Sequence, residues 1–197
     1  MAERNEPTSM LVLIAQRDAG ELNGVWTLVP ELCLAKFRTK SLWGLIGIEG
    51  RASFLRGTIT VDQAHIEGDV EIDARNISSK NKRRDGHLQS SEFFATNLHP
   101  TIEIRIDRID AQGGAFAAQA QIIIKGMPVT VTLPLEVTRI DEHTTRVRTI
   151  TVVDRSWWGL RWNQFGMASM QNHLEVTTTF VRRPPDATEE RLGVGEA

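Results

Sequence analysis

The residues best suited to chemistry stand in one polar stretch, which holds Arg83, Arg84, Asp85, His87 and Glu92. Arginine forks match the oxygens of phosphate and carboxylate groups, and a helix N-terminus also attracts anions. The stretch could therefore meet a phosphate or quinone head group. The alternative is structural: the aspartate caps a helix, the arginines form a solvated turn, and the histidine packs or hydrogen-bonds.

The same stretch offers the nearest candidates for acid–base catalysis, with Asp85 and His87 as acid and base and Glu92 close by. The other four histidines are scattered over predicted strands and turns, and Cys33 is the single cysteine. Neither pattern is typical of a metal site or an internal disulfide. The sequence also lacks a glycine-rich phosphate loop and a G-x-S-x-G nucleophile motif. We therefore predict no metal, no cofactor and no catalytic residue.

A helix is predicted to carry this stretch. Between Leu88 and Leu98, apolar residues recur at three- and four-residue steps, which is the spacing of one helix face. Asp85 is expected to be the N-cap, and Pro100 forces the helix to end near His99.

The rest of the chain is predicted to form short strands. Alternation of apolar and polar residues is clearest over 64–74 and 101–110, as in half-buried antiparallel strands. Lys125 to Pro128 predict a hairpin turn, and Pro134 marks an edge or bulge. The expected strands are 11–15, 24–29, 32–39, 43–49, 54–61, 64–74, 101–110, 115–124, 129–137, 144–154 and 174–181.

This pattern favours an all-β fold, an antiparallel barrel of about eight strands with one inserted lateral helix. At 197 residues the chain is expected to form one domain over 21–182, after a loose segment 1–20 and before a disordered tail 183–197. The net charge of −2 argues against a nucleic-acid partner. The start of the chain is a poor secretory signal, and no run approaches the roughly 18 apolar residues of a membrane span, so a cytoplasmic protein is expected.

Four segments, in order, resemble the motifs of the YceI-like family. They are GVWTLVPELCLAKF (24–37), RDGHLQSSEFFATNLHPTIEI (84–104), IIIKGMPVTVTLPL (122–135) and DRSWWGLRW (154–162). The second is quite specific, and its occurrence before the third makes chance similarity improbable. The resemblance spans Gly24 to Phe180. The chain departs from the family at Glu31 and Leu32, where a His-Ser pair is usual, and at Ala52, where Phe is usual.

The resemblance implies a lipocalin-like barrel that binds a polyisoprenoid or another long-chain lipid as a carrier, store or sensor. A homodimer and a peripheral membrane contact are further expectations by analogy. The apolar positions then describe a tunnel, with Arg84 and His87 at its mouth. The aromatic residues expected to line it are Phe37, Trp43, Phe54, Phe93, Phe94, Phe116, Trp158 and Phe165.

Two alternatives of other classes remain open at this stage. One is a small hydrolase or isomerase for a lipid-like substrate, with His87 and Asp85 as acid and base. The other is an interaction module whose aromatic residues simply fill a solid core. The segment Trp157 to Trp162 could either form an exposed rim or cap the core.

Overall fold

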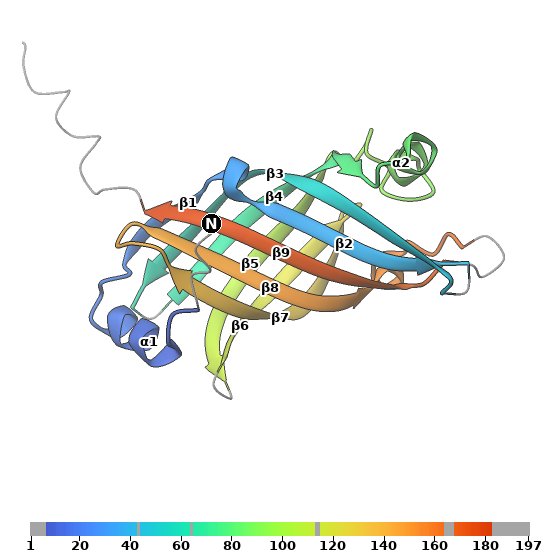
Figure 1. The fold of residues 1–197 in the computed structure, drawn as a ribbon. Coiled ribbons are helices and arrows are strands. Elements are labelled where there is room, and N and C mark those ends of the chain that lie inside the picture. Colours follow the sequence, from blue (N-terminus) through green and yellow to red (C-terminus); the bar gives the residue numbers. More distant parts are fainter. Residues whose placement is uncertain (1–6, 43, 64, 113–114, 164–167, 183–197) are drawn as a thin grey trace, which may run out of the picture.

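The computed structural model shows a closed antiparallel barrel (Figure 1), and it describes residues 7–42, 44–63, 65–112, 115–163 and 168–182. Two α-helices, α1 (Met10–Asp18) and α2 (Lys82–Gln89), and two 3₁₀ turns, η1 (Pro30–Leu32) and η2 (Arg155–Trp158), accompany nine strands in these residues. The strands are β1 (Gly24–Leu28), β2 (Leu34–Ser41), β3 (Ile46–Asp62), β4 (His65–Ser78), β5 (Thr101–Gln112), β6 (Ala115–Ile124), β7 (Met127–Arg139), β8 (Thr144–Asp154) and β9 (Gln171–Arg182).

Eight positions around the barrel accommodate the nine strands. The order β3-β2-β9-β8-β7-β6-β5-β4 closes because β4 pairs back with β3. β1 is the extra strand: like β2 it pairs with β3 and β9, and η1 separates the two strands along this shared position. The predicted all-β barrel of about eight strands is confirmed.

The hairpin between β6 and β7 is confirmed. Lys125 and Gly126 both have positive φ, +54° and +74°, as a two-residue type I′ turn requires. Pro134 pairs with Ala117 of β6, but β7 pairs with β8 only over Glu136–Arg139. The expected edge character of Pro134 is therefore confirmed, since it lies outside the stretch that joins β8.

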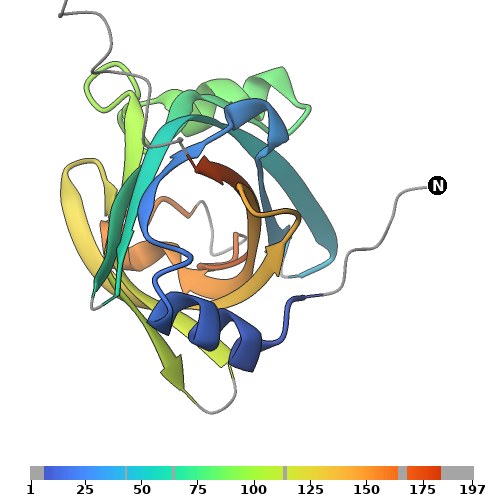
Figure 2. The same cartoon turned by 90° about the vertical axis from the view of Figure 1, so that its left-hand side faces the viewer.

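The start of the chain differs from the prediction. The strand expected over Leu11–Ala15 is wrong, because α1 occupies this segment, and the expectation of a loose segment over 1–20 fails for the same residues. Leu13 is only 4% exposed, and Thr8 ties the chain to β7 by a backbone bond to the Val137 carbonyl (2.9 Å). A short apolar run fits either secondary structure when taken alone. Figure 2 looks into the barrel from this end, where α1 lies across the rim.

The lateral helix α2 exists, but its predicted bounds are wrong. Asn81 is the N-cap and accepts a hydrogen bond from the Arg84 N–H (3.1 Å), whereas Asp85 lies within the helix. The helix ends at Gln89, after which the chain folds back through turns, and Ala95 has φ +50°. The apolar spacing beyond Leu88 thus belongs to an irregular segment, from which Phe93 and Phe94 line the barrel cavity whereas Leu98 is 79% exposed.

The strands predicted over 43–49 and 54–61 form one strand, β3, which is 17 residues long. Its register with β4 shifts between Arg51 and Ser53 and again between Phe54 and Arg56. These irregularities bend the strand without ending it, as the density of glycines indicated. In the described part of the chain, no helix is long and apolar enough to cross a bilayer.

Candidate functional site

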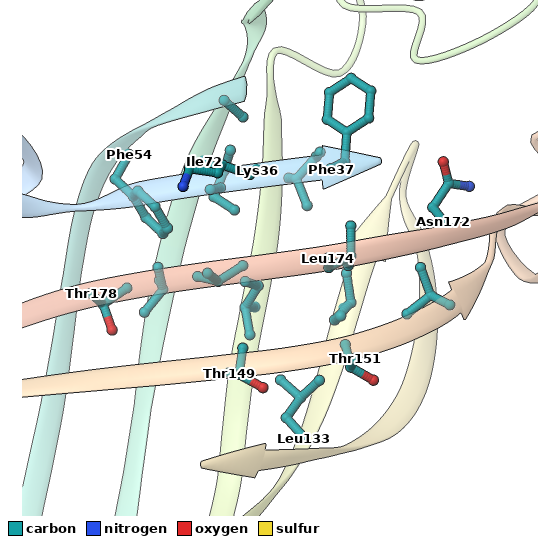
Figure 3. A pocket seen from close by; sticks show the side chains of 18 of the residues that line it. Lys36, Phe37, Phe54, Ile72, Leu133, Thr149, Thr151, Asn172, Leu174 and Thr178 are labelled. Atoms are coloured by element: carbon teal, nitrogen blue, oxygen red, sulfur yellow. The ribbon is translucent and has the colours of Figure 1, made fainter. Parts of the chain in front are cut away.

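A cavity of about 1000 Å³ lies inside the barrel (Figure 3). It extends from α1, where Leu13 lines it, to α2, where Leu88 lines it. Its wall is mainly aliphatic and comes from the inward-facing residues of the strands, among them Ile59, Val70, Ile72, Ile104, Ile106, Ile122, Leu133, Leu174 and Val176. A volume of this size is at the upper end of ordinary ligand pockets.

The cavity contradicts the solid-core alternative and unites most of the residues expected at the site. Eight of those ten residues line it: Phe37, Phe54, Arg84, His87, Phe93, Phe94, Phe116 and Trp158. The other two, Trp43 and Phe165, lie outside the described residues.

An aromatic cluster lies at the α2 end of the cavity. The Phe93 and Phe94 rings meet edge to face, with centroids 5.3 Å apart, and the His87 ring stands 4.1 Å from Trp162. On β2, the Phe37 ring lies over Gly50, where a Cβ atom would come within 2.1 Å of the ring. The glycine at this position therefore makes room for an aromatic wall.

The polar residues predicted at this mouth have partners of their own. Arg84 donates from Nε to the Ser79 hydroxyl (2.7 Å), and His87 Nε2 lies 3.2 Å from Glu92 Oε2. Asp85 accepts from the Ser79 N–H (2.7 Å) and the Ser78 hydroxyl (3.2 Å). Desolvation opposes the charge of Asp85, but these bonds and nearby Arg84 outweigh it and lower its pKa. Asp85 thus holds the turn before α2, and its partners differ from the acid–base pair of the hydrolase hypothesis.

Arg155 lines the cavity and was missed by the sequence analysis. It begins η2, is 6% exposed, and donates from Nε to the Ser169 carbonyl (3.1 Å) and from Nη1 to the Leu160 carbonyl. Its guanidinium lies over the Phe93 ring, 5.4 Å from the centroid. Burial lowers the pKa of Arg155, and the charge of Asp154 offsets only part of this effect. The local sequence, an Asp-Arg pair followed by aromatic residues, does not predict that this arginine is buried.

One wall of the cavity carries hydroxyl groups among the aliphatic residues. Thr149 and Thr151 of β8 and Thr178 of β9 face inward, as Figure 3 shows, and the Asn172 side chain joins them from the end of β9. The Thr178 hydroxyl donates to the Val147 carbonyl (3.4 Å), whereas Thr149 Oγ1 is buried and has no hydrogen-bond partner in the described part of the chain. The β8–β9 wall therefore offers polar contacts that a pure hydrocarbon would not use.

At the α1 end, two arginines flank Trp26. The guanidinium carbons of Arg139 and Arg182 lie 5.7 Å and 5.5 Å from its ring centroid, and the indole N–H donates to the Leu22 carbonyl (2.9 Å). Burial and the charge of Arg182 lower the pKa of Arg139, whose Nη1 is buried without a partner. This cluster also was not predicted, because its members are far apart in the sequence.

The aromatic segment after β8 fulfils both roles that were considered for it. Trp158 is 3% exposed and anchors η2, because its indole donates to the Ile122 carbonyl of β6 (2.8 Å). Trp157 is 49% exposed and points outward. Trp162 lies between, in contact with His87 and lining the cavity.

The closed antiparallel barrel and its apolar cavity define the class of lipocalin-like barrels that enclose a small ligand. Within that class, the chain belongs to the YceI-like family, because the YceI-like domain matches residues 26–181. The resemblance seen in the four sequence motifs is thereby confirmed.

Individual relatives are distant. A UPF0312 protein of Pseudomonas aeruginosa is 24% identical over 139 residues, which cover 69% of this chain and 66% of the relative. The crystal structure of Burkholderia cenocepacia BcnA matches with a TM-score of 0.69 at 16% identity, over 77% of this chain and 98% of that one. A polyisoprenoid binding domain from Saccharophagus degradans, implicated in plant cell wall breakdown, matches with a TM-score of 0.64 at 14% identity, over 80% and 98%. At these identities the structural matches establish the shared fold.

Proposed function

We propose that the protein binds a long-chain isoprenoid or fatty lipid inside the barrel, as a carrier, store or sensor. The observation that carries this proposal is the mainly aliphatic cavity of about 1000 Å³. Burial of hydrocarbon contributes roughly 0.8 kcal/mol per CH₂ group. A chain of about 16 such groups would gain roughly 13 kcal/mol, against an association cost of about 4–15 kcal/mol. Extensive hydrocarbon contact is therefore needed for useful affinity, and the cavity provides it.

Family membership supports the same proposal. The S. degradans domain, which shares the fold, is described as polyisoprenoid binding. The cavity of this chain is lined by the inward-facing residues of an equivalent barrel, so an isoprenoid is the first ligand class to test.

The direct test is native mass spectrometry of the purified protein, followed by solvent extraction and identification of what co-purifies. We expect one equivalent of a compound with a long hydrocarbon chain. If extraction returns nothing, and added prenols, fatty acids and fatty amides neither bind nor raise the melting temperature, the proposal is wrong.

A further inference from the structure

The charged side chains that line the cavity are mainly basic, although carboxylates outside the lining pair with two of them, Asp18 with Arg17 (2.8 Å) and Glu175 with Lys36 (3.9 Å). Although the whole chain has a net charge of −2, the cavity is lined by six basic side chains and by a single carboxylate, Glu92, among the described residues. Glu92 is mostly exposed and is paired with His87. The basic residues are Arg17, Lys36, Arg83, Arg84, Arg139 and Arg155. A cavity of this composition favours an anionic group on its ligand.

Arg155 is the most deeply placed of these cations. It is 94% buried, and two of its three nitrogens donate to the carbonyl groups of Ser169 and Leu160. The third, Nη2, is buried and has no hydrogen-bond partner among the residues that the structure describes. The carbonyl groups are neutral, so these contacts orient the guanidinium without neutralising its charge.

No carboxylate forms an ion pair with Arg155 in the part of the chain that the structure describes. The nearest in sequence, Asp154, turns its carboxylate to the Ser156 N–H (2.8 Å), where it caps η2. A buried charge without a counter-ion is costly, and so is a buried donor without an acceptor. An anionic oxygen in the cavity would relieve both costs at once.

We propose that Arg155 binds the anionic oxygens of an acidic lipid head group, a carboxylate or a phosphate, whose hydrocarbon chain fills the barrel. This inference rests on the proposed function and adds the charge and the position of the head group. The Phe93 ring covers one face of the guanidinium, and the two carbonyl groups hold Nε and Nη1, so Nη2 is the donor left to meet an anionic oxygen.

Arg139 is the rival site, at the opposite end of the cavity. Its Nη1 also lacks a partner, but the residue is only half-buried, and Glu21, Asp141 and Glu142 act on its charge. Three carboxylates therefore act on the charge of Arg139, whereas only Asp154, which forms no ion pair with Arg155 among the described residues, acts on the charge of Arg155. Arg139 serves as the matched control.

The experiment compares ligands that share a chain and differ in head-group charge. Delipidated protein is titrated with oleate against oleyl alcohol and with farnesyl phosphate against farnesol, and the affinity ratio of anion to alcohol is measured for each pair. Wild-type protein, Arg155→Met and Arg139→Met are compared. A charged hydrogen bond in a buried site corresponds to an affinity ratio of about 10 to 100.

We expect the wild-type ratio to exceed about tenfold for at least one pair, to fall toward one in Arg155→Met and to persist in Arg139→Met. The pair that shows the ratio tells carboxylate from phosphate. The role of Arg155 would be overturned by a wild-type ratio near one, by an unchanged ratio in Arg155→Met, or by a loss of the ratio only in Arg139→Met. In each of these cases, binding of the alcohols would still support the proposed function. If neither alcohol nor anion binds the wild type, both proposals fail.

Arg155 also holds two carbonyl groups, so a second variant covers the case in which Arg155→Met misfolds and no longer binds the alcohols. In that event Arg155→Lys, which keeps the charge but not the planar fork, decides the question. The anion-to-alcohol ratio must then drop several-fold, and an unchanged ratio counts against the role of Arg155.

Discussion

Thr149 illustrates at the scale of one residue how the cavity differs from a packed core. Its side chain lines the cavity from β8, and its hydroxyl oxygen is buried without a hydrogen-bond partner among the described residues. Because an unpaired buried hydroxyl costs about 1–3 kcal/mol, we expect Thr149→Val to raise the free energy of unfolding of the ligand-free protein by about 1 kcal/mol, measured by urea denaturation. The matched control is Thr179, which is 1% exposed and donates to the Leu32 carbonyl (3.3 Å). Thr179→Val should lower the free energy of unfolding by about 1 kcal/mol. If both variants changed the free energy of unfolding in the same direction, this account would be contradicted.

Asp85 makes a residue-scale prediction about pH. Its pKa is lowered in the folded state, because hydrogen bonds from Ser79 and Ser78 outweigh desolvation. A group with a depressed folded pKa contributes stability above its unfolded pKa, about 3.9, and this contribution is lost as the pH falls through the folded value. We expect Asp85→Asn to lower the free energy of unfolding by about 1 kcal/mol at pH 7. As the pH falls from about 5 to about 2, the variant should lose less stability than the wild type. Denaturation curves across that range measure the difference, and parallel curves for the two proteins would refute the role of Asp85.

At the scale of the element, β3 and β4 approach each other closely at Gly68. A Cβ atom there would lie 2.2 Å from the Thr58 carbonyl oxygen and 2.9 Å from the Ile59 Cα. Since backbone cannot move aside as a side chain can, we expect Gly68→Ala to destabilise the protein by about 1–3 kcal/mol. Gly47, near the start of β3 where it pairs with Lys40 of β2, has no described atom within 4 Å of its Cβ position and provides the control. Thermal unfolding of both variants is the measurement, and a neutral Gly68→Ala would show that the strands separate more easily than their geometry indicates.

The secondary structure elements also show which parts of the fold the sequence predicts. Period-two alternation predicted β5 closely, because a half-buried antiparallel strand shows that pattern directly, and richness in Thr, Val and Ile predicted β8. It failed for Met10–Asp18, where the apolar run is too short to separate helix from strand and only its contact with the barrel end decides. It also extended α2 too far, since residues after Gln89 bury apolar side chains from turns with the spacing of a helix.

The site was predictable only in part, for a related reason. The rings at Phe37, Phe93 and Trp158 could be chosen because large apolar residues inside a barrel must face its interior. Arg155 and Arg139 could not, because an arginine on a strand end is ordinarily exposed. Their burial depends on η2 and α1, which fold over the two ends of the barrel, and on pairings between distant segments.

At the scale of the whole molecule, a hollow barrel and a packed one respond differently to the same substitution. Val176 lines the cavity from β9, in register with Ala35 of β2 and Thr149 of β8 on the two neighbouring strands. In a solid core, Val176→Trp would be an overpacking change with a cost of about 1–3 kcal/mol or more. In a hollow barrel the indole occupies space that the ligand would use, so the ligand-free protein should lose little stability.

We therefore expect Val176→Trp to keep a melting temperature near that of the ligand-free wild type and to lose lipid binding by at least about tenfold. A bound ligand stabilises the folded state in proportion to the logarithm of its concentration over Kd, so the rise in melting temperature on adding lipid should disappear in the variant. Val152→Trp places the same ring on the outer face of β8, where the valine is 45% exposed, and should retain both binding and the thermal shift. If Val176→Trp unfolds while Val152→Trp does not, the barrel is packed in solution and the cavity is not the binding site. If both fold and both bind, the ligand lies elsewhere on the molecule.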